Sequence, residues 1–360
     1  AAYTPEELNR REAIVRDAAA IEEGLRRDHP DWADRLRSWE EAAKTPGPSW
    51  TVVRTDVDAN NGTGQKHTMQ EDGSLLASGY APTLHVDTFT ALEPVPAVAA
   101  VRLELLNDPS LPLNGPGRST KGLFALTDFQ VEVAPADKPG QWAPAKIARA
   151  TADVNPAEAA LEPIFDDRSG KRRVTGPIEY AIDGKVETAW GIDIGPGRRN
   201  VPRQAVFVLE KPVSFPAGVR LRFKLDQRHG GWNSDDNQNN NLGRFRLSAT
   251  DAADAAADPA PAAAREALAV APDARTPAQA AALFAHFRTT VPEWKDANGR
   301  IEALWKAHPE GSSQLVLRDR KRETHRLERG DFLKPAEVVQ PGMPTFLNPP
   351  PSTPSPSRLD

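Results

Sequence analysis

The sequence predicts a mainly β protein, with an antiparallel β-sandwich over about residues 49–250 and helical hairpins at 1–48 and 251–310. In the middle of the chain, apolar residues alternate with mostly polar ones, which is the period of strands with one buried face. Both flanks instead place apolar residues at helical spacings. The 34 prolines and 24 glycines punctuate mainly the middle, as expected for a set of strands joined by turns.

The alternation marks several strands. A set of about 200 residues is large for one sandwich, and residues 134–175 within it are rich in proline, alanine and charge with only scattered apolar residues. We interpret that stretch as a long excursion between two halves of the strand set. The alternating apolar positions are Val101, Leu103 and Leu105; Phe129, Val131 and Val133; Val206 and Val208; and Val219, Leu221, Phe223 and Leu225.

The N-terminal flank begins with a helix-capping box. Thr4 is followed three residues later by Glu7, with proline between them, and this pattern predicts a helix over about residues 5–27. A second stripe at helical spacing completes the predicted hairpin. It consists of Trp32, Leu36 and Trp39.

The C-terminal flank starts with a predicted linker at 251–261, which is made mostly of alanine, aspartate and proline. Helical patterns follow at 262–269, 277–287 and 292–307, and we expect these helices to dock on each other. Residues 311–360 are expected to be extended and to end in a proline-rich linker.

Composition excludes several classes of function. A formal net charge of −5 argues against a nucleic-acid binder that relies on a bulk positive field. Without cysteine the chain forms no disulfide, iron–sulfur cluster, thiolate zinc site or covalently attached haem. Its longest apolar stretch, residues 280–285, is far shorter than the roughly 20 residues of a membrane span, so no span is expected.

Motifs of catalysis are also missing from the sequence. The seven histidines show no helical zinc-ligand spacing, and there is no phosphate loop, dinucleotide fingerprint or nucleophile elbow. Acidic pairs such as Asp166 with Asp167 are interpreted as solvated surface. We therefore predict a non-catalytic protein, with a polysaccharide lyase that uses Arg228 and His229 as the alternative.

One turn is a candidate calcium site. Asp183 begins an Asp-Gly turn five residues before the hydroxyl of Thr188 and seven before Trp190, and such a turn can offer carboxylate, hydroxyl and carbonyl oxygens to a hard cation. The alternative is a plain turn followed by a buried tryptophan. Residues 56–62 begin like an EF-hand loop, but their glycine comes one place late and the twelfth position is His67, which leaves only a different kind of calcium loop.

A second group of residues suggests a carbohydrate site. Basic residues occupy the outward parity of two predicted strands, and the loop at 226–241 holds an indole, amides, carboxylates, arginine and histidine. Stacking and bidentate hydrogen bonds of this kind bind sugars, and the cations favour an acidic polysaccharide. The alternative is a solvated loop beside ordinary surface charges. The predicted ligand-binding residues are Arg222, Lys224, Arg228, His229, Trp232 and Arg244.

Several strings, taken in order, resemble the central region of the large multidomain cytochrome c-type proteins of planctomycete bacteria. They include residues 72–79, 115–119, 227–230, 242–248 and 324–335, so the resemblance covers nearly the whole chain. It implies an exported protein, periplasmic or at the cell surface, whose partners are flanking haem and other domains. The haem-attachment motif Cys-x-x-Cys-His is absent, so electron transfer is not carried over.

The spacing of Asp183, Thr188 and Trp190 is also similar to a signature of discoidin-type and related galactose-binding-like carbohydrate modules. This resemblance implies a galactose-binding-like jelly-roll sandwich in which Asp183 and Thr188 help to hold a structural calcium. The expected function is a non-catalytic carbohydrate-binding module of an exported multidomain protein. The alternative is a structural scaffold that positions the haem and flanking domains.

Overall fold

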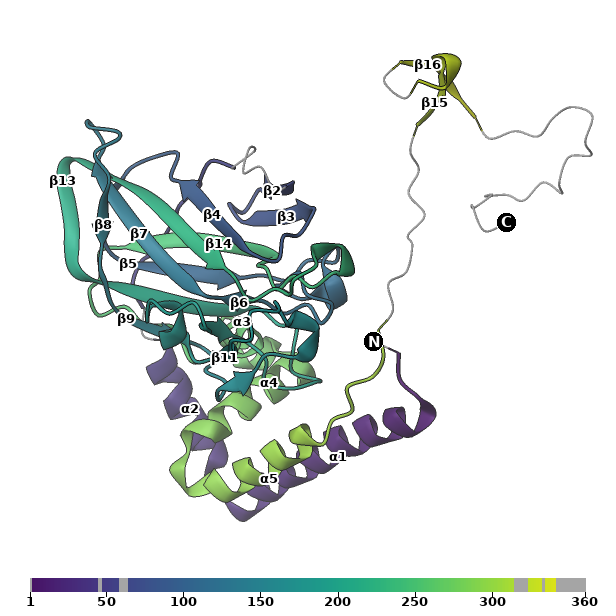
Figure 1. Cartoon of the computed structure of the whole chain (residues 1–360). Helices are drawn as coiled ribbons and strands as arrows, with labels where there is room; N and C mark the ends of the chain where they lie inside the picture. Colours follow the sequence, from purple (N-terminus) through teal and green to yellow (C-terminus); the bar gives the residue numbers. More distant parts are fainter. Residues whose placement is uncertain (1, 45–46, 58–63, 314–322, 332–333, 341–360) are drawn as a thin grey trace, which may run out of the picture. The chain divides into compact units, whose positions relative to one another are not determined.

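The computed structural model describes residues 2–44, 47–57, 64–313, 323–331 and 334–340, in two units that comprise Ala1–Ser312 and Ser313–Asp360. The chain is mainly β (Figure 1). Its α-helices are α1 (Pro5–Asp28), α2 (Trp32–Ala43), α3 (Ala262–Leu268), α4 (Pro277–Phe287) and α5 (Lys295–Lys306). Its strands are β1 (Thr51–Val52), β2 (Gln65–Met69), β3 (Leu75–Gly79), β4 (His85–Thr90), β5 (Val95–Leu105), β6 (Ala125–Leu126), β7 (Asp128–Pro135), β8 (Ala143–Ala145), β9 (Ile147–Ala152), β10 (Ala159–Ala160), β11 (Val174–Gly176), β12 (Thr188–Gly191), β13 (Arg203–Gln227), β14 (Arg244–Thr250), β15 (Thr324–Leu327) and β16 (Pro335–Val339).

A large antiparallel sheet of ten strands forms the main part of the first unit. Its order is β2-β3-β14-β5-β13-β7-β8, with β1 paired to β14 and with β4 and β9 paired to β13. Strand β13 pairs first with β5 and β9 and later with β4 and β7. Register shifts in its pairing with β5, between Val208 and Val213 and between Ser214 and Val219, separate these two halves.

The two halves of β13 lie in layers that pack face to face. Phe207 in the first half stacks on Phe129 of β7 with ring centroids 4.1 Å apart. Phe89 of β4 lies 5.5 Å from Phe245 of β14. Strands β4 and β7 therefore cover β5, β14 and the start of β13 (Figure 1). A core with many aromatic side chains fills the space between them.

The predicted alternation is confirmed in the second half of β13, where Val219, Leu221, Phe223 and Leu225 are buried and the residues between them are partly exposed. The first half is buried on both faces, because alanines from the predicted linker cover its outer side. Ala255 and Ala257 pack on Ala100, Val206 and Val208. The linker residues are thus part of the packed unit, since small side chains let the backbone lie close to the sheet.

Residues 134–175, interpreted above as an irregular excursion, contain four strands. β9 pairs with the first half of β13, and β8 pairs with β7. β10 and β11 join a second, four-stranded sheet of order β10-β11-β12-β6, in which β11 and β12 are parallel. Alternation does not reveal these strands, because they are short and partly exposed and several of their positions are alanine or proline.

The predicted helices are present, and their packing agrees with the prediction only in part. Thr4 and Glu7 form the predicted capping box at the start of α1. Within the C-terminal flank α3 and α4 dock on each other as predicted, and further contacts run between opposite ends of the chain: α1 packs beside α5 and α2 contacts α4 (Figure 1). The N-terminal stripe packs against a buried cluster of Phe284, Phe287, Val291 and Trp294. The two flanks therefore interleave and do not form two separate hairpins.

The first unit begins and ends at the same place. Ala2 and Ser312 exchange backbone hydrogen bonds of 2.7 and 2.8 Å. The second unit contains the antiparallel pair β15 and β16, and the predicted proline-rich linker at 349–357 lies outside the described residues. No helix in the described part of the chain is long and apolar enough to cross a membrane.

The packing of helices from both flanks around Phe284 leads to a prediction about stability. Phe284→Ala should lower the free energy of unfolding by about 3–5 kcal/mol, because it leaves a cavity between helices from both ends of the chain. Leu8→Ala is the control, since Leu8 is 44% exposed on α1. Urea unfolding of both variants checks this, and an equal effect of the two substitutions would contradict the interleaved packing.

Candidate ligand-binding site

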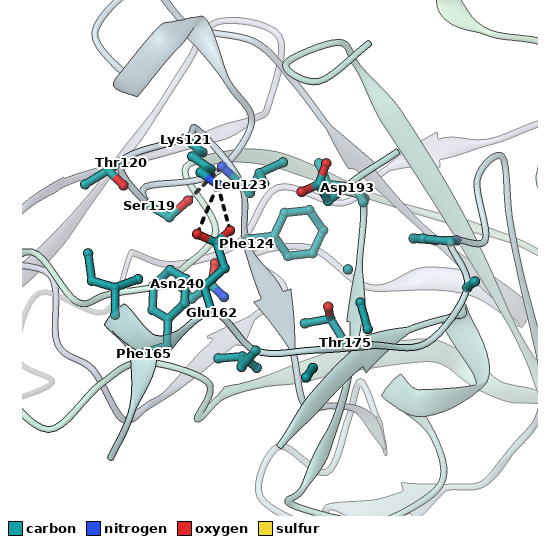
Figure 2. Close-up of a pocket in the computed structure, with 18 residues that line it drawn as sticks. Ser119, Thr120, Lys121, Leu123, Phe124, Glu162, Phe165, Thr175, Asp193 and Asn240 are labelled. Atoms are coloured by element: carbon teal, nitrogen blue, oxygen red, sulfur yellow. Dashed lines mark hydrogen bonds and ion pairs between the residues drawn. The ribbon is translucent and has the colours of Figure 1, made fainter. Parts of the chain in front are cut away.

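A pocket of about 480 Å³ opens on the small four-stranded sheet (Figure 2). It is bounded by the loop before β6, the segment around β10, β11 and the end of β12. Much of its lining is apolar, which is usual for sites that bind small molecules. The apolar lining comprises Leu123, Phe124, Pro156, Ala157, Ala159, Ala160, Leu161, Ile164, Phe165 and Ile192.

The loop before β6 is shaped by close backbone contacts. A Cβ atom at Gly117 would lie 2.0 Å from the carbonyl oxygen of Leu123, so only glycine fits there. The hydroxyl of Ser119 accepts a hydrogen bond of 2.9 Å from the backbone N–H of Leu123. These contacts hold the turn that carries Thr120 and Lys121 to the edge of the pocket.

A few polar groups converge on this apolar lining. The side chain of Asn240 is only 7% exposed, and its amide forms no hydrogen bond with another described residue. The hydroxyls of Thr120 and Thr175 also line the pocket and likewise have no bond to a described side chain or backbone group. Asn240 is buried and buried polar groups need partners, so its amide is available to a ligand, and the two half-buried hydroxyls lie beside it in the lining.

A chain of ion pairs borders the pocket. Lys121 Nζ lies 2.9 Å from Glu162 Oε1, as Figure 2 shows, and 3.3 Å from Glu310 Oε1. Arg199 pairs with Glu310 and, at 2.7 Å from Nε to Oδ1, with Asp193. Glu310 follows α5, so the chain of charges connects the helical region with the pocket.

These pairs keep the charges in place. Burial alone would raise the pKa of Asp193, but hydrogen bonds from Arg199 and the backbone N–H of Gly195 outweigh it, so the pKa is lowered. Burial likewise acts to lower the pKa of Lys121, but Glu162 and then Glu310 outweigh it and raise the pKa. Asp193 and Lys121 therefore both stay ionised at the edge of the pocket around neutral pH.

The predicted ligand residues Arg222 and Lys224 lie outside this pocket, on the outer face of β13. Arg222 Nε lies 2.5 Å and Lys224 Nζ lies 3.0 Å from the carboxylate of Glu132 on β7. The guanidinium of Arg222 also lies 4.4 Å from the ring centroid of Trp142. Arg222 and Lys224 therefore share the carboxylate of Glu132.

Arg244 lies on a different part of the sheet. Its strand does not lie beside residues 219–228, as a single basic face would require, because β14 pairs with β1, β3 and β5. Arg244 itself lies 3.1 Å from Asp72 Oδ2 and 3.5 Å from Asp108 Oδ2. The predicted single basic face is therefore divided between separate strands, and its charges have acidic partners.

Arg228 and His229 follow the end of β13. Arg228 Nε donates to both carboxylate oxygens of Asp226 at 2.8 Å. His229 is 0% exposed, with its ring nitrogens 3.0 Å from Thr127 Oγ1 and 3.3 Å from the carbonyl of Glu187. His229 is thus a core residue that a surface ligand does not reach, which removes the geometric basis of a lyase using this pair.

Trp232 is a predicted ligand residue that the structure leaves accessible, with 50% of its surface exposed, and Arg228 is exposed as well. The basic neighbour of Trp232 is Arg168, whose guanidinium carbon lies 3.4 Å from the indole ring centroid. Sequence reasoning missed Arg168 because it falls in the excursion at 134–175. Only the fold brings the two residues together, through a hydrogen bond of 3.1 Å from the N–H of Trp232 to the carbonyl of Asp166.

In the candidate calcium turn, the carboxylate oxygens of Asp183 already accept hydrogen bonds from other groups of the same turn. The hydroxyl of Thr188 donates to the carboxylate of Asp183 at 2.9 and 3.0 Å, and the N–H of Lys185 donates to Oδ1 at 2.9 Å. The ammonium of Lys185 lies 4.0 Å from the same carboxylate. A cation that needs six to eight oxygen ligands fits poorly among these donors. Trp190 is fully buried, as the alternative interpretation predicted.

Clusters of metal-ligating side chains are absent from the residues that the structure describes. In the described residues there is no group of three or more His, Asp or Glu side chains that could hold a metal ion. Most of the other candidate calcium loop, from residue 58 onward, lies outside the described residues.

The hydrogen bonds within the turn at Asp183 and Thr188 lead to a prediction about calcium. We expect the same melting temperature in calcium and in a chelator, and Thr188→Val should cost about 1 kcal/mol by removing its hydrogen bond to Asp183. Differential scanning calorimetry of both proteins measures this. A calcium-dependent rise in melting temperature that Asp183→Asn abolishes would instead establish the cation site.

The buried histidine predicts a pH dependence of stability. Burial, followed by the charge of Arg173, lowers the pKa of His229 to about 4. The unfolded chain takes up this proton near pH 6.5 and the folded chain only near 4, so stability is lost as the pH falls between these values. His229→Gln and His229→Asn remove this titration. The stability advantage of the wild type over both variants should therefore shrink by about 3 kcal/mol from pH 7 to pH 4 in urea unfolding. A constant difference would show that His229 has the same pKa in the folded and the unfolded chain.

Comparison with known proteins leaves the resemblances noted in the sequence as predictions: no protein-family model, no curated protein and no solved structure matches this chain.

Proposed function

We propose that the chain is a carbohydrate-binding module and that a sugar residue occupies the pocket on the small sheet. The observation that carries the proposal is the combination of a mostly apolar lining with the unbonded amide of Asn240 and the hydroxyls of Thr120 and Thr175. A sugar matches this combination, because it has apolar C–H faces and a ring of hydroxyl groups.

The aromatic residues in the lining support the assignment. Phe124 and Phe165 both line the pocket, and Phe124 packs edge-on against the buried Trp190 at 5.4 Å between ring centroids. Their positions are fixed by the core, so binding costs little ordering of side chains. A preformed site of this kind suits recognition of a rigid ring.

The charges at the pocket edge favour hydroxyl recognition over catalysis. Glu162 and Asp193 are each held in ion pairs with Lys121 and Arg199. The pKa of Asp193 is lowered, whereas a general acid at neutral pH requires a raised pKa. Charged groups of both signs can bind vicinal hydroxyls, and we propose no catalytic step for this site.

The proposal also includes the type of sandwich, the location of the protein and its neighbouring domains. The two face-to-face layers and the buried Trp190 are compatible with a galactose-binding-like jelly roll. The export of the protein, its periplasmic or cell-surface location and its flanking haem and other domains are inferred from the resemblance of the sequence.

A binding assay tests the proposal. Isothermal titration with cellohexaose, xylohexaose and oligogalacturonates should find at least one ligand. Asn240→Ala should weaken it about 5- to 20-fold by removing a buried hydrogen bond. Ala160→Phe should abolish binding by filling the pocket from the exposed strand β10.

Asn9→Ala on the exposed face of α1 is the matched control and should leave affinity unchanged. Circular dichroism of each variant checks that the fold is kept. Binding that survives Ala160→Phe in a folded protein would place the site elsewhere.

A structural scaffold is the second candidate function. It is favoured by the helices from both flanks packing together, because their shared core makes a rigid body that can hold attached domains in fixed positions. A chain that binds no glycan on a broad array would support this function over the first.

A further inference from the structure

We propose that Arg168 and Trp232 form a second subsite that binds the acidic group of a uronate or sulfated sugar next to the sugar in the pocket. This inference rests on the proposed function and names its ligand class. An acidic polysaccharide was expected from the basic residues of β13 and β14; the structure transfers that role to an arginine in the segment between β10 and β11.

The first argument is that the charge of Arg168 is unused. Six arginines in the described residues lie over a tryptophan ring, namely Arg26, Arg35, Arg102, Arg168, Arg198 and Arg222. Five of them also form an ion pair with a glutamate. Arg168 forms none with any described residue, so its guanidinium is free for an anion.

The second argument is the chemistry of the pair. A guanidinium stacked on an indole is held flat, while its edge N–H groups still point away from the ring and can bind a carboxylate or sulfate through two hydrogen bonds. Half of the indole surface remains exposed beside it. The pair thus offers an anion site next to an aromatic surface.

The third argument is that the backbone holds Arg168 in place. Arg168 has a φ of 61°, a left-handed conformation that side chains other than glycine rarely adopt. The carboxylate of Asp166 accepts a hydrogen bond of 3.0 Å from the N–H of Arg168, and the carbonyl of Asp166 accepts one of 3.1 Å from Trp232. Asp166 thus connects both members of the subsite.

The buried Arg173 connects the segment that carries Arg168 with the loop that carries Trp232. Arg173 is 8% exposed and donates to the carbonyls of Arg228 and Gly230 at 2.9 and 3.0 Å and to that of Phe165. Its charge is balanced by Asp167 at 3.3 Å. Arg173 is a positioning residue, because it joins the segment of Arg168 to the loop of Trp232 without reaching a ligand.

The subsite is close to the pocket. Phe165 lines the pocket and stands three residues before Arg168, so their Cα atoms are at most about 11 Å apart. Adjacent residues of one polysaccharide can therefore occupy the pocket and the subsite together. The other predicted cations, Arg222, Arg228 and Arg244, each have a carboxylate partner within 3.1 Å.

The experiment compares matched ligands by isothermal titration at low and moderate salt. The probes are tetragalacturonate, its fully methyl-esterified form and a sulfated galactan tetrasaccharide. We expect the wild type to prefer at least one acidic probe to the neutral ester, with the preference falling as salt rises. The better acidic probe identifies the anion as carboxylate or sulfate.

Arg168→Gln should reduce affinity for the acidic probe by about fivefold or more and leave the neutral probe unchanged, which corresponds to about 1 kcal/mol for a partly exposed charge pair. Arg168→Lys should retain part of the preference, since it keeps the charge and loses the planar stack. Trp232→Ala should weaken both kinds of probe. Arg16→Gln on α1 is the control of equal charge change, since Arg16 is exposed there and paired with Asp17.

Two outcomes would overturn the inference separately from the proposed function. Equal affinity for acidic and neutral probes, or an acidic preference that Arg168→Gln leaves intact, rejects the subsite while the pocket stands. Failure of every probe, and of cellohexaose and xylohexaose, to bind the wild type rejects the proposed function itself.

Discussion

Strand β13 is the element on which the rest of the first unit depends. Its 25 residues pair with four other strands, and its two halves lie in facing layers. Because side chains of a strand alternate between faces, one continuous strand that bends between Val208 and Val219 contributes to both sides of the aromatic core. A change of register in either half would turn Phe207 or Phe223 away from that core, so the pairing of β4, β5, β7 and β9 is specified by a single segment.

The end of β13 also determines where the binding loops lie. Asp87 on β4 is buried and accepts hydrogen bonds from Gln227 at 2.7 Å and from Gln65 at 3.1 Å, and it lies 2.7 Å from a ring nitrogen of His85. Gln227 in turn accepts one of 2.6 Å from the N–H of Leu242. Buried polar groups are costly without partners, so this network fastens both ends of the loop that carries Trp232. The loop can therefore present an exposed indole without being loosely held.

Charge pairing explains why an abundance of surface arginine does not make a basic face. The chain has 45 basic and 50 acidic residues, and neighbouring strands set them opposite each other. Arg222 meets Glu132 across the pairing of β13 with β7, and Arg246 meets Glu104 across that of β14 with β5. Cross-strand pairs of opposite charge stabilise a sheet and leave little field for a distant ligand. Recognition of an anion then depends on a cation outside the ladders, and Arg168 is in such a position.

The sequence by itself determined the elements that obey a local rule. The capping box of Thr4 and Glu7, the helical stripe at Trp32 and the alternation at 219–227 each reflect the repeat of one helix or strand, so they could be predicted. Trp232 could be singled out as a loop indole, and the buried Trp190 as one of two interpretations. The tertiary structure alone decided which flanking helices pack together, that the alanines of 251–261 cover the sheet, and that Arg168 stacks on Trp232. It also decided that His229 is buried and that Arg222 and Arg244 are paired. These outcomes depend on contacts between residues far apart in the chain, and such contacts leave no periodic trace in the sequence.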